Sequence, residues 1–210
     1  MKIIELLIDT LDELTGVDAV ALVEEPAIES NFFAFSKEEN LEETILYNFL
    51  KLNIEELTES KIKEETQEVT GKHSFAVVED QQMVVGPLMI PEKLILRIDE
   101  ATQEPYYVFF SQETIKEVAH KMMKNKFIDS LNIEHNPEDV VDGYMVSTWI
   151  VEDVEKDKQA VYGFNCPVGT LMGQYKIESK EAWAKVKAGE IKGFSVEGFF
   201  SDRFVQAKAI

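Results

Sequence analysis

Residues 83–111, MVVGPLMIPEKLILRIDEATQEPYYVFFS, determine the fold class that the sequence predicts. This stretch holds three short apolar runs, rich in β-branched and aromatic residues, with Gly, Pro, Asp and Glu between them. Such runs, bounded by turn-forming residues, are typical of β-strands. The same pattern recurs on both sides, at residues 2–8, 17–23, 31–36, 73–80, 130–135, 143–153, 169–178 and 192–200.

Two helices are expected among these strands. Ser111 is a suitable N-cap for a helix over residues 112–126, and Ser179 for a shorter one that Gly189 ends. The first has an apolar stripe at helical spacing, made by Ile115, Val118, Ala119 and Met122. Because regular helical crossovers between strands are missing, we predict an α+β, mainly β fold: a mixed β-barrel or sandwich with flanking helices.

Residues 37–71 differ from the rest of the chain, with ten Glu and four Lys in this stretch. Asn40 with Glu43, and Asn53 with Glu56, each resemble a helix cap followed by an acid in the first turn. We predict an acidic helical insertion, with a solvated linker of helical tendency as the alternative. The whole chain, residues 1–210, is then expected to be a single domain carrying this insertion.

Charge and composition exclude several classes of function. The formal net charge is −19 and 45% of the residues are hydrophobic, so we expect a folded protein that repels nucleic acid and anionic membranes. No apolar stretch approaches the roughly 18 residues that a membrane-spanning helix needs, and the acidic first 14 residues do not resemble a signal peptide. The single cysteine, Cys166, excludes an intrachain disulfide and fits a reducing cytoplasm.

No motif indicates a metal or a cofactor. HExxH, CxxC and the glycine-rich phosphate loops are all missing from the sequence. Of the three histidines, His120 falls within a predicted helix and His73 opens a predicted strand, and both are more typical of structural or exposed residues. His135 is different, because it ends the predicted strand 130–135 just before Asn-Pro-Glu-Asp, at a strand-to-turn boundary where active-site groups often lie.

Among the classes of function considered, a hydrolase with a serine or cysteine nucleophile remains. Ser195 lies in GFSVEG, with Phe194 and Val196 expected on one face of the strand and Ser195 with Glu197 on the other. That local pattern alone fits an ordinary strand serine as well as a nucleophile. Cys166, followed by proline, is a rival nucleophile, although a small buried thiol is the commoner case.

Six pieces of the sequence, in order, resemble the phage prohead (capsid maturation) serine proteases. They are GVDAVALVEEPAIESNFFAFS, VVGPLMIPEKLILR, PYYVFFSQETIKEVAHKMMKN, NIEHN, STWIVED and WAKVKAGEIKGFSVEGFF. The resemblance covers most of the chain outside residues 37–71. It implies the fold of the herpesvirus assemblins, a β-barrel core surrounded by helices.

The resemblance also implies a catalytic pair, His135 from NIEHN and Ser195 from GFSVEG. Assemblins add a second histidine, but no histidine follows Ser195 here, and the phage branch is expected to use an acid. Glu197 is preferred as this third member because it shares the strand face of Ser195, and Asp153, which ends STWIVED, is the alternative.

The implied activity is that of a serine endopeptidase that cuts scaffold protein, capsid protein and itself during prohead maturation. The resemblance places it in the host cytoplasm, inside the assembling procapsid, with capsid and scaffold proteins as partners and a homodimer or higher oligomer as a possible active form. The alternative is a non-catalytic capsid-assembly or scaffold-type protein that retains the protease fold.

Overall fold

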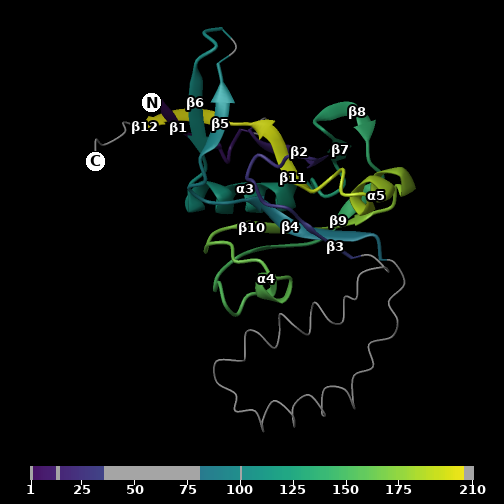
Figure 1. Ribbon diagram of the computed structural model, residues 1–210. Helices are drawn as coiled ribbons and strands as arrows, with labels where there is room; N and C mark the ends of the chain where they lie inside the picture. Colours follow the sequence, from purple (N-terminus) through teal and green to yellow (C-terminus); the bar gives the residue numbers. More distant parts are fainter. Residues whose placement is uncertain (1, 13–14, 36–80, 100, 206–210) are drawn as a thin grey trace.

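The computed structural model describes residues 2–12, 15–35, 81–99 and 101–205 (Figure 1). The described strands form three four-stranded sheets. The first has the order β12-β1-β6-β5, from Ser201–Val205, Ile3–Leu7, Pro105–Phe109 and Ile95–Ile98. The second has the order β3-β4-β10-β9, from Phe33–Phe35, Met83–Met89, Leu171–Ile177 and Gly143–Ile150. The third has the order β11-β2-β7-β8, from Gly193–Phe199, Gly16–Val23, Leu131–Ile133 and Asn136–Val140.

Three described helices complete the fold: α3 (Gln112–Asn125), α4 (Lys158–Val161) and α5 (Lys180–Lys187). The predicted N-caps are both confirmed, with Ser111 Oγ accepting from Thr114 N and Ser179 Oγ from Ala182 N. The predicted apolar stripe of α3 is buried. These caps satisfy backbone N–H groups that the first helical turn would otherwise leave unpaired.

The two ends of the chain form one long antiparallel ribbon. Strand β1 pairs with β12 in the first sheet, and β2 pairs with β11 in the third. Because β12 follows β11 after Phe200 alone, the ribbon passes directly from one sheet to the other. Phe194, on β11, is buried and its ring centroid lies 5.3 Å from that of Phe32 and 5.2 Å from that of Tyr175. This packing fixes which face of β11 meets the core.

The α+β, mainly β class is thus confirmed, but none of the three sheets closes into a barrel over the described residues. Each sheet is open and has an edge strand on either side, because its first and last strands do not pair with each other. In a barrel these two strands would pair and close the sheet. The predicted acidic helices of residues 37–71 and the predicted strand 73–80 lie outside the described residues.

One turn was predicted wrongly. Residues 136–139, Asn-Pro-Glu-Asp, were expected to form a turn after His135 but lie in strand β8 (Asn136–Val140). This strand is at the edge of its sheet and all five of its residues are exposed. An exposed edge strand tolerates proline and needs no apolar alternation, so Asn-Pro-Glu-Asp carries no strand signal. Strand β12 and helix α4 were not predicted either.

Candidate active site

A row of side chains crosses the third sheet at the level of Ser195. Ser195 on β11 pairs with Ala21 on β2, and Ala21 pairs in turn with Asn132 on β7. Residues in register on neighbouring strands project from the same face of a sheet. Ser195 is buried, with 8% of its surface exposed, and Phe194 beside it packs into the core. The alternation predicted for this strand therefore holds at the serine.

The small side chains of β2 allow contact between strands that are not neighbours. Asn132 Nδ2 donates a hydrogen bond of 2.6 Å to Glu197 Oε1, although β2 lies between β7 and β11. Glu197 pairs with Ala19 and Asn132 with Ala21. Two strand spacings separate the backbones by about 10 Å, and a larger residue on this face of β2 would fill that space.

His135 lies in the tight turn between β7 and β8. Ile133 pairs with Asn136, which leaves Glu134 and His135 as the two turn residues, with φ of 51° and 61°. Positive φ at both central residues is the requirement of a type I′ hairpin turn, where Asn-Gly is favoured and other residues are strained. Glu134 ties the turn to the end of β2, since its N–H donates to Leu22 O at 3.2 Å and its Oε1 accepts from Glu24 N at 2.6 Å.

The turn brings His135 to Glu197. Nδ1 of His135 lies 3.2 Å from the same Oε1 atom that accepts from Asn132. The side chains are 43% exposed for His135 and 31% for Glu197, so the imidazole remains accessible while its Nδ1 side is held. A carboxylate in this position fixes the imidazole tautomer with Nδ1 protonated and leaves Nε2 free to exchange a proton.

A cavity of about 630 Å³ joins these residues. His135, Ser195 and Glu197 all line it. Figure 1 shows β11 between the hairpins β5–β6 and β7–β8, and the cavity takes residues from both sides. Its other walls are mostly apolar, from Leu6, Ala27, Ile28, Leu88, Met89, Ile90, Ile95, Phe110, Phe194, Val196, Phe199 and Phe200. An apolar cavity with a few convergent polar groups is the usual form of a small-molecule or peptide site.

The family comparison matches the greater part of this chain. A model of the family described as "Putative phage serine protease XkdF" matches residues 74–203, which contain His135, Glu197 and Ser195. The chain belongs to this family of phage serine proteases. No curated protein and no solved structure matches the sequence.

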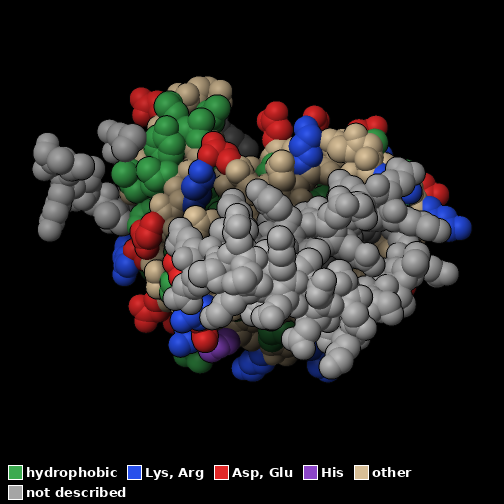
Figure 2. Space-filling model, turned by 60° about the horizontal axis from the view of Figure 1, so that its bottom comes forward, with side chains coloured by type: hydrophobic (Ala, Val, Ile, Leu, Met, Phe, Trp, Pro, Cys, Tyr) green, Lys and Arg blue, Asp and Glu red, His purple; other side chains and the backbone are tan. Residues whose placement is uncertain are grey.

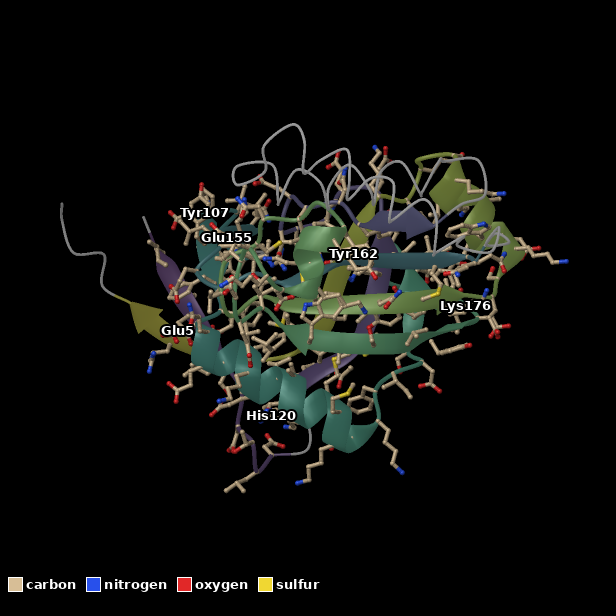
Figure 3. The ribbon with its side chains drawn as sticks, turned by 90° about the horizontal axis from the view of Figure 1, so that it is seen from below. Glu5, Tyr107, His120, Glu155, Tyr162 and Lys176 are labelled. Carbon is tan, nitrogen blue, oxygen red and sulfur yellow. The ribbon has the colours of Figure 1, made fainter. Side chains whose placement is uncertain are left out.

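Asp153, the alternative third member, does not line this cavity. Asp153 follows β9, is 51% exposed, and accepts hydrogen bonds from the N–H groups of Glu155 and Lys156 in its own turn. The structure thus brings Glu197, and not Asp153, to His135. His120 is exposed on α3 (Figure 3), and His73 lies outside the described residues. No described helix is long and apolar enough to span a membrane.

Cys166 is buried in a small cluster with Val151 and Met172. Burial raises the pKa of its thiol, which disfavours the thiolate that a nucleophile needs. Gln159 holds the backbone on both sides of the sulfur, donating to Cys166 O at 3.0 Å and accepting from Cys166 N at 2.9 Å. These contacts are those of a packed core cysteine.

A second serine has a basic neighbour. Lys158 Nζ donates to Ser147 Oγ at 3.2 Å and to Gln174 Oε1 at 3.0 Å, and partial burial lowers the pKa of Lys158. The ammonium also lies 4.7 Å from the ring centroid of Trp149 and 5.9 Å from that of Tyr162, beside α4 (Figure 3). Two aromatic rings stabilise the charged ammonium, which opposes a role as a base. Neither Ser147 nor Lys158 lines the cavity that contains His135.

The sequence analysis missed Asn132. It is buried, its Nδ2 holds Glu197, and its Oδ1 has no hydrogen-bond partner among the described residues. A buried polar atom without a partner is uncommon and is often found where function requires it. The available signal was an asparagine three residues before His135 in a strand that is otherwise apolar.

Proposed function

We propose that this protein is the serine endopeptidase of phage prohead maturation, with Ser195 as nucleophile, His135 as general base and Glu197 as the residue that orients His135. The proposal is supported most by the contact of 3.2 Å between Glu197 and His135 at the wall of the cavity that Ser195 also lines. Its substrates are scaffold and capsid proteins and the chain itself, inside the assembling procapsid in the host cytoplasm.

The reaction is acyl transfer from an amine to water. His135 Nε2 takes the proton of Ser195 Oγ as this oxygen attacks the peptide carbonyl carbon, and the tetrahedral intermediate collapses as His135 returns the proton to the leaving amine. Water then attacks the acyl-enzyme, again losing a proton to His135, and the serine is released with a carboxylic acid product. Glu197 stabilises the imidazolium that forms in both steps.

Ser195 Oγ makes no hydrogen bond to His135 or to any other described residue. Proton transfer therefore requires the imidazole to approach the serine, or one water to bridge them. The partial exposure of His135 at the tip of a two-residue turn is compatible with such a movement when a substrate fills the cavity. Backbone N–H groups are the expected donors to the oxyanion.

Cleavage of the phage's own scaffold and capsid proteins, co-expressed with this chain and followed by gel electrophoresis and mass spectrometry, tests the assignment. Ser195→Ala should reduce cleavage by about 10⁴-fold or more. Ser147→Ala is the matched control, because it removes the hydroxyl beside Lys158, and it should leave cleavage unchanged.

Reaction with a fluorophosphonate gives an independent test. The adduct should map to Ser195 and disappear in Ser195→Ala. An adduct on Ser147 would instead identify Ser147, beside Lys158, as the nucleophile. If wild-type protein neither cleaves nor forms an adduct while it promotes capsid assembly, it is a non-catalytic assembly protein with a protease fold.

A further inference from the structure

Arg97 is the only lysine or arginine among the residues lining the candidate catalytic cavity in the described part of the chain. The whole sequence has two arginines. The other, Arg203, donates to the buried carboxylate of Glu5 from both Nε and Nη2, so its role is to pair that carboxylate. The chain has a net charge of −19, so a guanidinium in this cavity is unusual and suggests that Arg97 has a specific role there.

The guanidinium of Arg97 is not committed to any described carboxylate. Its one hydrogen bond is from Nη1 to the backbone oxygen of the preceding Leu96, at 3.4 Å. Two of the described acidic residues line the same cavity, and neither forms an ion pair with Arg97. Glu197 contacts His135, and Asp18 lines the cavity without an ion pair to Arg97. A guanidinium presents five N–H donors in a planar fork that matches a carboxylate, so most of its binding capacity remains available.

Strand β5 directs Arg97 toward the cavity and leaves a free backbone edge. Ile95, which is buried, and Arg97, which is exposed, both line the cavity, whereas Leu96 and Ile98 project from the opposite face and are exposed as well. The bond from Asp99 N to Glu104 O shows that the odd-numbered residues pair with β6. The N–H and C=O groups of Leu96 and Ile98 therefore point away from β6, and no described strand pairs with that edge.

A second cavity, of about 660 Å³, continues past the same strand. It shares Ala27, Ile95 and Arg97 with the catalytic cavity, so Arg97 lies where the two meet. Hydrophobic side chains gather on this side of the molecule, where β5 and β6 lie (Figure 2). An extended polypeptide paired with the edge of β5 would run along both cavities and present alternate side chains to them.

We propose that Arg97 is a specificity determinant that binds the carboxylate of a glutamate or aspartate side chain in an extended substrate, close to the bond that is cut. The inference rests on the proposed function, since it concerns the substrate of the same cavity. Glu24, Glu25 and Glu29 line the second cavity, and Glu24 and Glu29 are paired with Lys192 and Lys93. Glu25 has no such lysine among the described residues, so an acidic substrate residue placed beside it is repelled.

Two measurements on one peptide mixture separate this inference from the proposed function. The mixture is a chymotryptic digest of a bacterial proteome, in which lysine, arginine, glutamate and aspartate all remain at internal positions. Wild type is incubated with it and the cut sites are identified by mass spectrometry. Immobilised Ser195→Ala captures peptides from the same digest, which reports binding without cleavage. Glutamate and aspartate should be enriched about tenfold or more over glutamine and asparagine, at one position relative to the cut and among captured peptides.

Charge reversal provides the decisive comparison. Arg97→Gln should remove the acidic preference, and Arg97→Glu should replace it with a preference for lysine and arginine. Lys116→Glu, on the exposed face of α3, makes the same change in net charge outside the cavity and should leave the preference intact. A library of synthetic peptides with amidated carboxyl termini and unmodified side chains distinguishes side-chain carboxylates from a free chain end, because only the former keep their enrichment.

The outcomes are distinct. Cleavage without an acidic preference, or a preference that survives Arg97→Glu, overturns the role of Arg97 and leaves the protease assignment standing. Enrichment that depends on the free chain end also overturns it. Captured peptides with an acidic preference that reverses in the Arg97→Glu, Ser195→Ala double variant, combined with no cleavage by wild type, support Arg97 and refute the protease.

Discussion

Glu197 Oε1 is held between two donors, with His135 Nδ1 at 3.2 Å and Asn132 Nδ2 at 2.6 Å. The first of these contacts joins two residues that are 62 positions apart, one in a hairpin turn and the other on the strand that carries Ser195. It is the contact through which a carboxylate would control the tautomer and the charge of the proposed base.

Glu197→Gln should lower kcat for scaffold cleavage by about 10²- to 10⁴-fold with little change in KM. A neutral amide neither stabilises the imidazolium nor fixes its tautomer, and the loss falls on the transition state. Steady-state kinetics on a cleaved capsid or scaffold fragment measure it. Glu138→Gln removes an exposed carboxylate from β8 of the same hairpin and should leave kcat unchanged. A normal kcat in Glu197→Gln would show that Glu197 is not the orienting residue.

Asn132→Asp should destabilise the fold at neutral pH by about 1–3 kcal/mol and slow cleavage, because it places a second carboxylate against Glu197. Lowering the pH from 7 to 5 should restore part of the lost stability, since protonation of the introduced carboxyl group removes the repulsion. Urea unfolding at the two pH values measures this. Asn165→Asp, at an exposed loop position, provides the control. Equal stability of Asn132→Asp and wild type would mean that the contact with Glu197 contributes nothing.

Sequence alone predicted the elements whose local signals agree with their tertiary surroundings. The caps at Ser111 and Ser179 were found because capping is local, and the alternation around Ser195 because one face of β11 packs Phe194 into the core. Strand β8 gave no signal because an exposed edge imposes no apolar pattern.

The site was harder to predict because its contacts cross strands. Glu197 meets Asn132 only because β2 presents Ala19 and Ala21 between them, and no spacing along the chain encodes that pairing. Arg97 belongs to the cavity because β5 faces it from another sheet. The sequence preferred Glu197 to Asp153 because Glu197 shares the strand face of Ser195, and the contact of Glu197 with His135 became visible only in the fold.

Cys166 should resist alkylation in the native protein at pH 7.5. Burial raises the pKa of its thiol, so the thiolate fraction at this pH is below that of an exposed cysteine, and access to the sulfur is blocked as well. Mass spectrometry after treatment with iodoacetamide should find Cys166 unmodified in native protein and fully modified in urea. Cys166→Ser should keep its protease activity, and rapid native modification that stops cleavage would favour a cysteine nucleophile instead.

Gly198→Ala should destabilise the fold by about 1–3 kcal/mol or more, the cost of overpacking a filled site. A methyl group added at Gly198 would lie 1.8 Å from the backbone oxygen of Gly16, which cannot move aside as a flexible side chain would. This close approach adjoins the irregularity in strand pairing between Glu197 and Gly198. Gly189→Ala is the comparison, since nothing lies within 4 Å of the added methyl and only the positive φ of 71° opposes it. A smaller loss for Gly198→Ala than for Gly189→Ala, measured by urea unfolding, would contradict the crowding.

His135→Asn should abolish cleavage while leaving the free energy of unfolding equal to that of wild type or up to about 1 kcal/mol higher. His135 holds φ at 61°, a left-handed conformation that asparagine adopts more readily. The contact with Glu197 that is lost is partly exposed and contributes little to stability. Urea unfolding and the cleavage assay measure the two effects separately. His120→Asn, at an exposed helix position, is the control and should keep full activity and nearly the same stability, because the two residues have similar helix propensities. A free energy of unfolding more than about 1 kcal/mol below that of wild type would show that His135 stabilises its turn. The left-handed backbone at this position would then not be strain retained for catalysis.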